Sequence, residues 1–338
     1  MDGYISYTAA TAAQADALAT AIPHIERQVN ELAAQGALGD VGPLFLGIGA
    51  SLAATAPAVW HLRKRGITAW RLDAGDTPLP LATGDHPVIG VSQSGRSSET
   101  IAALNTIPAT LRYGVVNTVP SPLADLATSL VGLGSIPDSY ASTIGYTATV
   151  VAVSMLAEAW SGGTVDPAWH DFAALFRKTE GMLAPQIDRA AALIASVPSL
   201  DFVGGGASTG SAEAGALLFR EVARIPASAM GTRQYLHGSM ESAGEGAHIL
   251  FGSEREHEVA HTLSTAGHRV VLVTTDDVEG SDHLEVVRLP HSSSHARAVL
   301  EALFLQGLVA AVAQSRGVEI EEFVFHNDDT KVDAGAPQ

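Results

Sequence analysis

The stretch from Val88 to Thr100, VIGVSQSGRSSET, constrains the fold more than any other part of the chain. Its first residues are apolar and mostly β-branched, which indicates a short buried strand of a parallel sheet. Hydroxyl side chains and Gly95 follow at once, and a helical pattern begins near Ile101. Hydrogen-bond donors between a strand end and a helix start favour negative charge, so the stretch predicts a phosphate-binding loop. The same serines are also typical of ordinary helix caps and turns.

Strands and helices alternate on both sides of this loop. The pattern predicts a helix over residues 11–35, strands at 43–48, 67–72 and 111–116, and a helix that opens at Gly49-Ala50-Ser51. This alternation favours a parallel sheet. The Gly-x-Ser turn is a second candidate cradle for a phosphate or sugar. It lacks the glycine spacing of a dinucleotide fingerprint, so we predict no dinucleotide cofactor there.

The second half of the chain repeats the order of the first. Strands are predicted at 200–203, 249–252 and 269–274, with a glycine-rich turn at 204–210 and helices at 213–224 and 296–316. We interpret this as an internal duplication of a βαβ unit. The Gly162-Gly163 pair and Pro167 mark a junction. The predicted division is an N-terminal helical segment (1–36), a first subdomain (37–165), a second subdomain (166–325) and a tail (326–338).

Composition excludes several classes of protein. The net charge of −17, without a cluster of Lys and Arg, argues against a nucleic acid or an anionic membrane as partner. The chain has no cysteine, which excludes disulfides, thiolate metal sites and cysteine nucleophiles. We find no signal peptide and no apolar run long enough to span a bilayer, and we therefore expect a cytoplasmic protein.

Several motifs in order carry a resemblance to a known family: GIGAS, VSQSGRSSET, YAST, GALLFREVARIPASAMGTRQYLHGS and the closing HNDDTKV. Together they resemble the double SIS (sugar isomerase) family, in particular the isomerase half of the glucosamine-fructose-6-phosphate aminotransferases. The likeness runs from about residue 44 to 332. It implies an α/β fold of two tandem SIS subdomains, each a parallel sheet flanked by helices in three flavodoxin-like layers. It also implies a homodimer with shared active sites, a sugar-phosphate substrate and no cofactor.

The resemblance also implies roles for individual residues. Glu221 matches the general base, and His237 matches a ring-opening histidine that the family supplies from a neighbouring subunit. Lys331 matches a lysine that closes over the open-chain sugar. A set of polar residues matches the positions that bind the phosphate and the sugar in the family: Ser51, Ser92, Gln93, Ser94, Ser97, Ser142 and Thr330.

Elementary chemistry is compatible with these roles. A buried carboxylate near neutrality can move a proton between C1 and C2 of an open-chain sugar, and imidazole can both accept and donate a proton near pH 7. A lysine can stabilise an oxyanion or form an imine. Structural alternatives exist for each residue: Glu221 as an ion-pair partner of a neighbouring arginine, His237 as a loop residue, Lys331 as a solvated tail residue, and Ser142 with Thr143 as helix caps.

The sequence departs from the family at positions that matter for the reaction. Leu218 and Ile144 stand where the resemblance implies lysines, Ser239 replaces a proline, and Ala227-Ser228 replaces Ala-Glu. We expect no glutaminase half and, because the sequence has no cysteine, no hydrolysis of glutamine. We therefore expect isomerisation of a hexosamine or ketosamine 6-phosphate with amine release, as in a glucosamine-6-phosphate deaminase or fructosamine-phosphate deglycase. The alternatives are a plain aldose–ketose phosphate isomerase, a non-catalytic sugar-phosphate sensor and, last, a structural dimerisation module.

Overall fold

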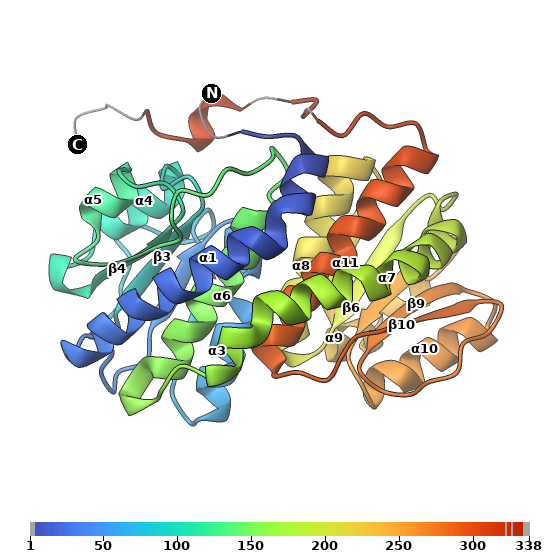
Figure 1. Cartoon of the computed structure of the whole chain (residues 1–338), viewed down its shortest axis with the longest axis horizontal. Helices are drawn as coiled ribbons and strands as arrows, with labels where there is room; N and C mark the ends of the chain where they lie inside the picture. The colour runs from blue at the N-terminus through green and yellow to red at the C-terminus, as the bar shows by residue number, and fades with distance from the viewer. Residues whose placement is uncertain (1–3, 322, 326, 334–338) are drawn as a thin grey trace.

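Two five-stranded parallel sheets form the framework of the molecule (Figure 1). The computed structural model describes residues 4–321, 323–325 and 327–333. Helices pack between the two sheets and on their outer faces, so that each half has three layers. The predicted α/β fold of two tandem subdomains, each a parallel sheet flanked by helices, is confirmed.

The first sheet has the strand order β2-β1-β3-β4-β5 and the second the order β7-β6-β8-β9-β10, all pairs being parallel. The strands of the first sheet are β1 (Leu44–Gly47), β2 (Trp70–Asp73), β3 (Val88–Ser92), β4 (Arg112–Val116) and β5 (Ser129–Gly132). Those of the second are β6 (Leu200–Gly204), β7 (Ala227–Gly231), β8 (Ala247–Phe251), β9 (Arg269–Thr274) and β10 (Leu284–Arg288). The two orders are the same, as a duplicated unit requires.

The helices between the sheets share one large apolar core with the inner faces of both sheets. They are α1 (Tyr7–Ala34), α2 (Ala50–Ala53), α3 (Ala56–Lys64), α6 (Ile144–Ala159), α7 (Phe172–Ile194), α8 (Thr209–Leu218) and α11 (Ser294–Ser315). The outer faces carry α4 (Ser98–Asn105) and α5 (Pro122–Leu126) on the first sheet, and α9 (Thr232–Leu236) and α10 (Arg255–Thr265) on the second. Short turns complete the chain: η1 (Ala109–Leu111), η2 (Trp160–Gly162), η3 (Pro167–Asp171), η4 (Gly206–Ser208), η5 (Phe219–Ala223), η6 (Ser239–Ser242) and η7 (Asp328–Thr330).

The sequence predicted the central strands and the outer strand β2, and it missed the other three outer strands. The bounds of β9 agree with the prediction, whereas β5, β7 and β10 were not predicted. These three are partly exposed, and β7 consists of Ala, Ser, Met and Gly, which have little β-propensity. Helix α1 begins at Tyr7 rather than residue 11 because the Ser6 hydroxyl accepts a hydrogen bond from the Ala9 N–H. The subdomain boundaries remain a prediction, and only residues 327–333 of the predicted tail lie within the described part.

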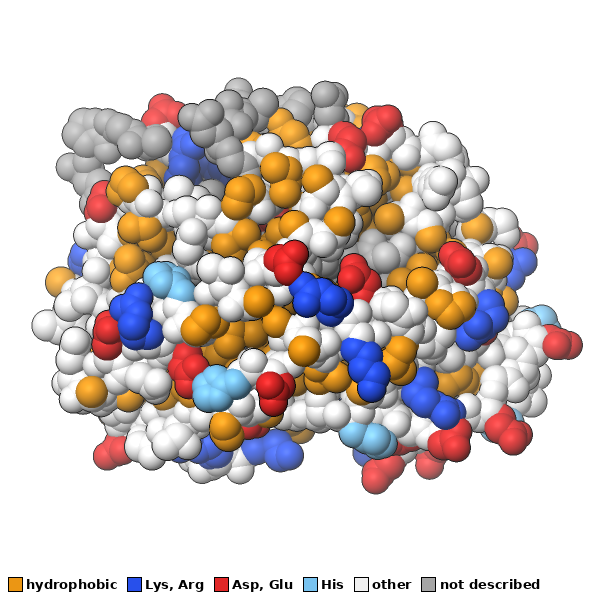
Figure 2. Space-filling view, in the orientation of Figure 1, with side chains coloured by type: hydrophobic (Ala, Val, Ile, Leu, Met, Phe, Trp, Pro, Cys, Tyr) orange, Lys and Arg blue, Asp and Glu red, His pale blue; other side chains and the backbone are white. Residues whose placement is uncertain are grey.

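The prediction that no apolar run is long enough to span a bilayer is wrong for α11, the one helix of the described chain that passes this test by length and composition. Inside the protein, 78% of its most apolar window is buried, as expected of a core helix. On the face shown in Figure 2, Lys and Arg side chains are dispersed among acidic ones rather than gathered in a patch.

Asp138 fixes the start of α6 from the preceding loop. Its buried carboxylate accepts hydrogen bonds from the N–H groups of Thr143 (3.0 Å) and Gly145 (3.0 Å) and from the hydroxyls of Ser142 (2.8 Å) and Thr143 (2.8 Å). The N-cap residue, Thr143, makes no capping bond with its own side chain. The capping role considered for Ser142 and Thr143 therefore belongs to Asp138, which also orients both hydroxyls.

Replacement of Asp138 by Ala is expected to lower the free energy of unfolding by about 3 kcal/mol, because several buried donors lose a charged acceptor. Urea unfolding measures this change. The control is Asp125→Ala, in the first turn of α5, where an exposed carboxylate is removed and we expect a change of about 0.5 kcal/mol or less. Equal effects of the two substitutions would contradict the assigned role.

Candidate functional site

The serine-rich loop lies at the carboxyl end of β3 and leads into α4. The hydroxyls of Ser92 and Ser97 are hydrogen-bonded to each other at 2.9 Å, and Ser92 is buried. Ser97 is the N-cap of α4 but accepts no capping bond with its side chain, which leaves the first N–H groups of the helix available to an anion. Gly95 has a φ of +66°, and a Cβ there would lie 2.0 Å from the Ser121 hydroxyl oxygen, so the turn requires glycine. Ser94 accepts a bond from the Arg96 N–H at 3.3 Å.

The C-terminal segment crosses from α11 to this loop, above both sheets in Figure 1. Arg96 joins this segment to the loop through two hydrogen bonds to the backbone of Val332. Its side-chain Nε donates to the Val332 carbonyl (2.6 Å), and its own carbonyl accepts from the Val332 N–H (3.0 Å). The Ser98 hydroxyl donates to the Asp329 carbonyl. Lys331 therefore pairs with Ser97 by a backbone bridge, and its side chain is exposed. Thr330 is also exposed, and its hydroxyl donates to the Asn327 carbonyl.

The start of α6 touches the serine loop. A Cβ on Gly145 would lie 2.8 Å from Cγ of Gln93 and 3.0 Å from the hydroxyl oxygen of Ser142. Glycine at this position lets the Gln93 side chain approach the helix N-terminus. The structure thus brings Gln93 and Ser142 together, although they are far apart in sequence.

Beyond Ser142 lies a cavity of about 30 Å³ between the two subdomains. Its polar side chains are Ser142, Tyr146, Glu221 and Gln306, and the rest of its wall consists of alanines and leucines. Ala50, which precedes Ser51, belongs to this wall. Ser51 itself is half-buried in the first turn of α2.

Glu221 enters the cavity from η5, a single π-helical turn that follows α8. Such turns are frequent at functional sites. Among the described residues its carboxylate has no hydrogen-bond or ion-pair partner, and Leu218 lines the cavity where the resemblance implied a lysine. Burial alone raises the pKa of Glu221 to about 7. The structural alternative, an ion pair with Arg220 or Arg224, is not formed: Arg220 donates to the Ala227 carbonyl and Arg224 to the Glu319 carbonyl.

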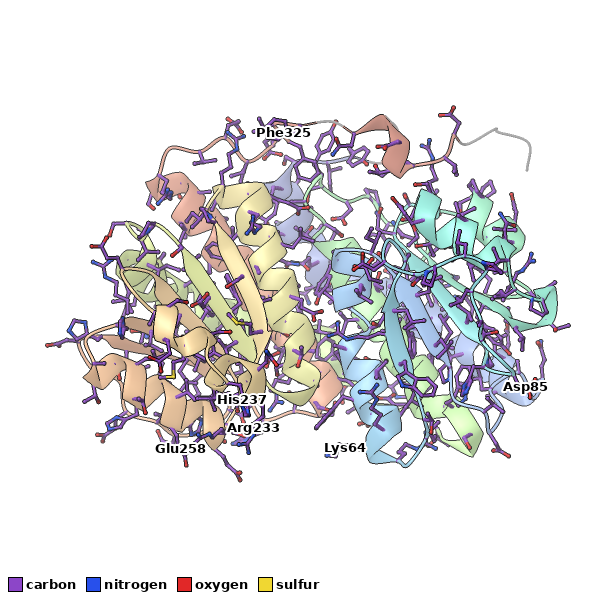
Figure 3. All side chains as sticks on the ribbon, turned by 180° about the vertical axis from the view of Figure 1, so that it is seen from behind. Lys64, Asp85, Arg233, His237, Glu258 and Phe325 are labelled. Carbon is purple, nitrogen blue, oxygen red and sulfur yellow. The ribbon has the colours of Figure 1, made fainter. Side chains whose placement is uncertain are left out.

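His237 lies at the opposite edge of the second sheet. Helix α8 returns antiparallel to the strands, so Glu221 precedes β7 at its amino end, whereas His237 follows β7 and α9 at the carboxyl end. The length of β7 alone separates the two positions by about 15 Å. Figure 3 places His237 near Arg233 and Glu258, far from Phe325 of the C-terminal segment. Within one chain the structure does not bring His237 to the cavity.

The second repeat has no open cradle at the position of the serine loop. Glu256, in the first turn of α10 after β8, fills this position with its own carboxylate. Oε1 accepts from the Thr232 hydroxyl at 2.5 Å, and Oε2 accepts from the Ser253 N–H at 3.2 Å. Of the two repeats, only the first offers a free loop to an anion.

Sequence reasoning missed Arg96, Asp138, Tyr146 and Gln306. Each lies within or beside a segment that the motifs singled out, except Gln306, which sits in the middle of an apolar helix. The signal for Gln306 was a lone amide on a buried helix face, and such a residue requires a polar partner. Within the described ranges, no group of three or more His, Asp or Glu side chains could hold a metal ion.

The comparisons with known proteins agree with this architecture. No protein-family model matches the chain. It is 24% identical over 261 residues to a glutamine–fructose-6-phosphate aminotransferase of Chlorobaculum tepidum, and 25% identical over 260 residues to that of Gluconobacter oxydans. These matches cover 72% and 69% of this chain but only 42% of each relative.

Solved structures cover nearly the whole chain. The C-terminal domain of a glucosamine-fructose-6-phosphate aminotransferase from Francisella tularensis has a TM-score of 0.80 at 18% identity, over 95% of this chain and 99% of that one. A glucosamine-6-phosphate deaminase from Thermotoga maritima has a TM-score of 0.72 at 19% identity, over 92% and 99%. Tagatose-6-phosphate ketose/aldose isomerase from Escherichia coli has a TM-score of 0.76 at 16% identity, over 98% and 97%. The chain is thus similar in sequence to part of the glutamine–fructose-6-phosphate aminotransferases, and it shares the fold of these solved phosphosugar isomerases and aminotransferase domain.

Proposed function

We propose that the protein is an enzyme that isomerises a hexosamine or ketosamine 6-phosphate and releases the amine. The observation that carries the proposal is Glu221: a carboxylate without a partner, with a pKa near 7, in a cavity that also contains Ser142. Ser142 is linked through Gln93 to an open anion cradle. Among proteins of the same fold, a glucosamine-6-phosphate deaminase and a ketose/aldose phosphate isomerase support this substrate class.

In the proposed mechanism, the substrate phosphate binds the 92–97 loop and the N-terminus of α4. The reacting carbons enter the small cavity, where Glu221 removes the proton from C2 of the open-chain aldose and returns it to C1. With an amino group on C2, this transfer gives a C2 imine. Water adds to the imine and ammonia leaves, which yields the ketose phosphate. No step requires a cofactor.

The other readings make different use of the same site. A plain aldose–ketose isomerase would use Glu221 in the same way but with a hydroxyl on C2. A sugar-phosphate sensor would use the serine loop but not Glu221. A dimerisation module would use neither the loop nor Glu221. The unpaired carboxylate favours an enzyme over a sensor, because a neutral side chain would fill the cavity at lower cost. We place the enzyme in the cytoplasm, where sugar phosphates are formed.

We further propose that the protein acts as a homodimer and that a second copy supplies His237. The imidazole would then open the sugar ring, and the exposed Lys331 would close over the open-chain form. This arrangement accounts for a histidine that lies at the other end of β7 from Glu221 in its own chain.

The phosphate loop predicts a ligand-dependent gain in stability. At about one hundred times its dissociation constant, a hexosamine 6-phosphate should stabilise the fold by roughly 2.7 kcal/mol. The unphosphorylated sugar, as the matched control, should stabilise it much less at the same concentration. Thermal unfolding measures both. Equal shifts of the unfolding temperature with the two sugars would show that the loop does not bind the phosphate.

Glu221→Gln tests the base directly, since it keeps the size of the side chain and removes its ability to accept a proton. On a panel of hexose and hexosamine 6-phosphates, wild-type protein should form ketose from one member, with ammonia if the substrate is an aminosugar. The variant should still bind this substrate. Its rate of exchange of the C2 proton with solvent should fall by about one hundredfold or more. Exchange at the wild-type rate would mean that the base lies elsewhere.

The shared site predicts complementation between two inactive variants. Glu221→Gln and His237→Ala homodimers should both be inactive, whereas a mixed dimer regenerates one intact site out of two. Random pairing in equal amounts makes half of the dimers mixed, so activity should recover to roughly a quarter of the wild-type value. If mixed dimers form and no activity returns, His237 acts within its own chain or not at all.

A further inference from the structure

The cavity around Glu221 lacks a cation. Leu218 and Ile144 stand where the resemblance placed lysines, and the lining residues include no Lys or Arg. Proton transfer between C1 and C2 builds negative charge on the neighbouring oxygen, and this charge requires a hydrogen-bond donor. The donor must come from the polar side chains of the cavity or from the C-terminal segment.

Two of these polar side chains already use their donors. The Gln306 amide donates to the Thr143 carbonyl at 3.1 Å, and its oxygen accepts from Gln14 at 2.7 Å. The Ser142 hydroxyl donates to Asp138 at 2.8 Å. Because Asp138 also caps α6, this bond cannot break without cost to the fold. Ser142 therefore has no free donor for the substrate, and Gln306 keeps only the second N–H of an amide that is already held at both ends.

Tyr146 is the side chain of the cavity wall whose donor is wholly unused among the described residues, and Lys331 of the C-terminal segment does not line the cavity. It lies one turn into α6, only 8% exposed, and lines the cavity together with Glu221. Within the described ranges its phenol has no hydrogen-bond partner. Glu213, a nearby carboxylate, forms a two-point ion pair with Arg71 instead. Burial, followed by the charges of Glu213 and Glu301, raises the pKa of Tyr146, so the phenol keeps its proton at neutral pH.

We propose that Tyr146 is a catalytic hydrogen-bond donor that takes the place of the missing cation: its phenol O–H binds the oxygen of the reacting carbons while Glu221 moves the C2 proton to C1. This inference rests on the proposed function. The phenol keeps its proton throughout. The negative charge that develops on the C1 oxygen is neutralised by a proton that passes to it from the amine or hydroxyl on C2, while Glu221 delivers the C2 proton to C1. A neutral donor suits a base whose pKa is raised by burial, because a cation at the same place would lower that pKa again.

The test is Tyr146→Phe, which removes only the hydroxyl. The turnover number and the rate of C2-proton exchange should both fall by about one hundredfold, while KM changes by less than about threefold. The pH at which the rate rises should stay near that of wild type, since Glu221 is unchanged. The control is Tyr113→Phe, equally buried at 8% exposure, whose hydroxyl donates to the Ala37 carbonyl away from the cavity. We expect it to keep its turnover number even if it is less stable.

The outcomes separate this inference from the proposed function. If Glu221→Gln is inactive and Tyr146→Phe turns over at the wild-type rate, the role of Tyr146 is wrong and the proposed function stands. If wild-type protein is inactive on the whole panel, the proposed function itself is wrong. If Tyr146→Phe fails to fold, 3-fluorotyrosine at position 146 replaces it. This residue keeps the ring and the donor, so activity must remain within about threefold of wild type, and its loss would overturn the inference.

Discussion

The carboxylate of Asp138 holds the candidate site together. Its hydrogen bonds fix the first turn of α6, and that turn touches both halves of the site. On one side, Gly145 lets Gln93 of the phosphate loop approach the helix. On the other, Ser142 and Tyr146 face the cavity of Glu221. One buried capping interaction therefore fixes the first turn of α6 relative to both the serine loop and the cavity, and it is more rigid than a contact between two loops.

The electrostatics of the site follow from what surrounds Glu221. Alanine and leucine side chains surround its carboxylate, and no Lys or Arg stands among the described residues that line the cavity, so burial raises its pKa without a compensating charge there. The second repeat shows the opposite arrangement, in which Glu256 is satisfied by a hydroxyl and a backbone N–H. One repeat thus keeps an open cradle and the other fills its own, which gives each chain one candidate site at the seam between its subdomains.

Local sequence patterns determined much of the fold but only part of the site. The buried strands β3 and β9 were predictable because apolar β-branched runs are bounded by turn residues. The outer strand β7 was not, because its small residues pair only through tertiary packing. Motifs predicted the residues of the serine loop, whereas Tyr146 and Gln306 were invisible within apolar helices. Their role depends on which faces of α6 and α11 meet, and this is decided by the packing of two subdomains rather than by neighbours in sequence.

A titration of the Glu221 carboxyl group tests whether this side chain is a buried base with a raised pKa. In protein labelled with ¹³C at the side-chain carboxyls of glutamate, the resonance that Glu221→Gln removes belongs to this group. We expect this resonance to titrate at about pH 7, because the carboxyl group is buried without a counter-charge. We also expect the resonance to shift when a hexosamine 6-phosphate binds. Titration near the ordinary glutamate value of about 4.3 would contradict a base buried in a cavity without a cation.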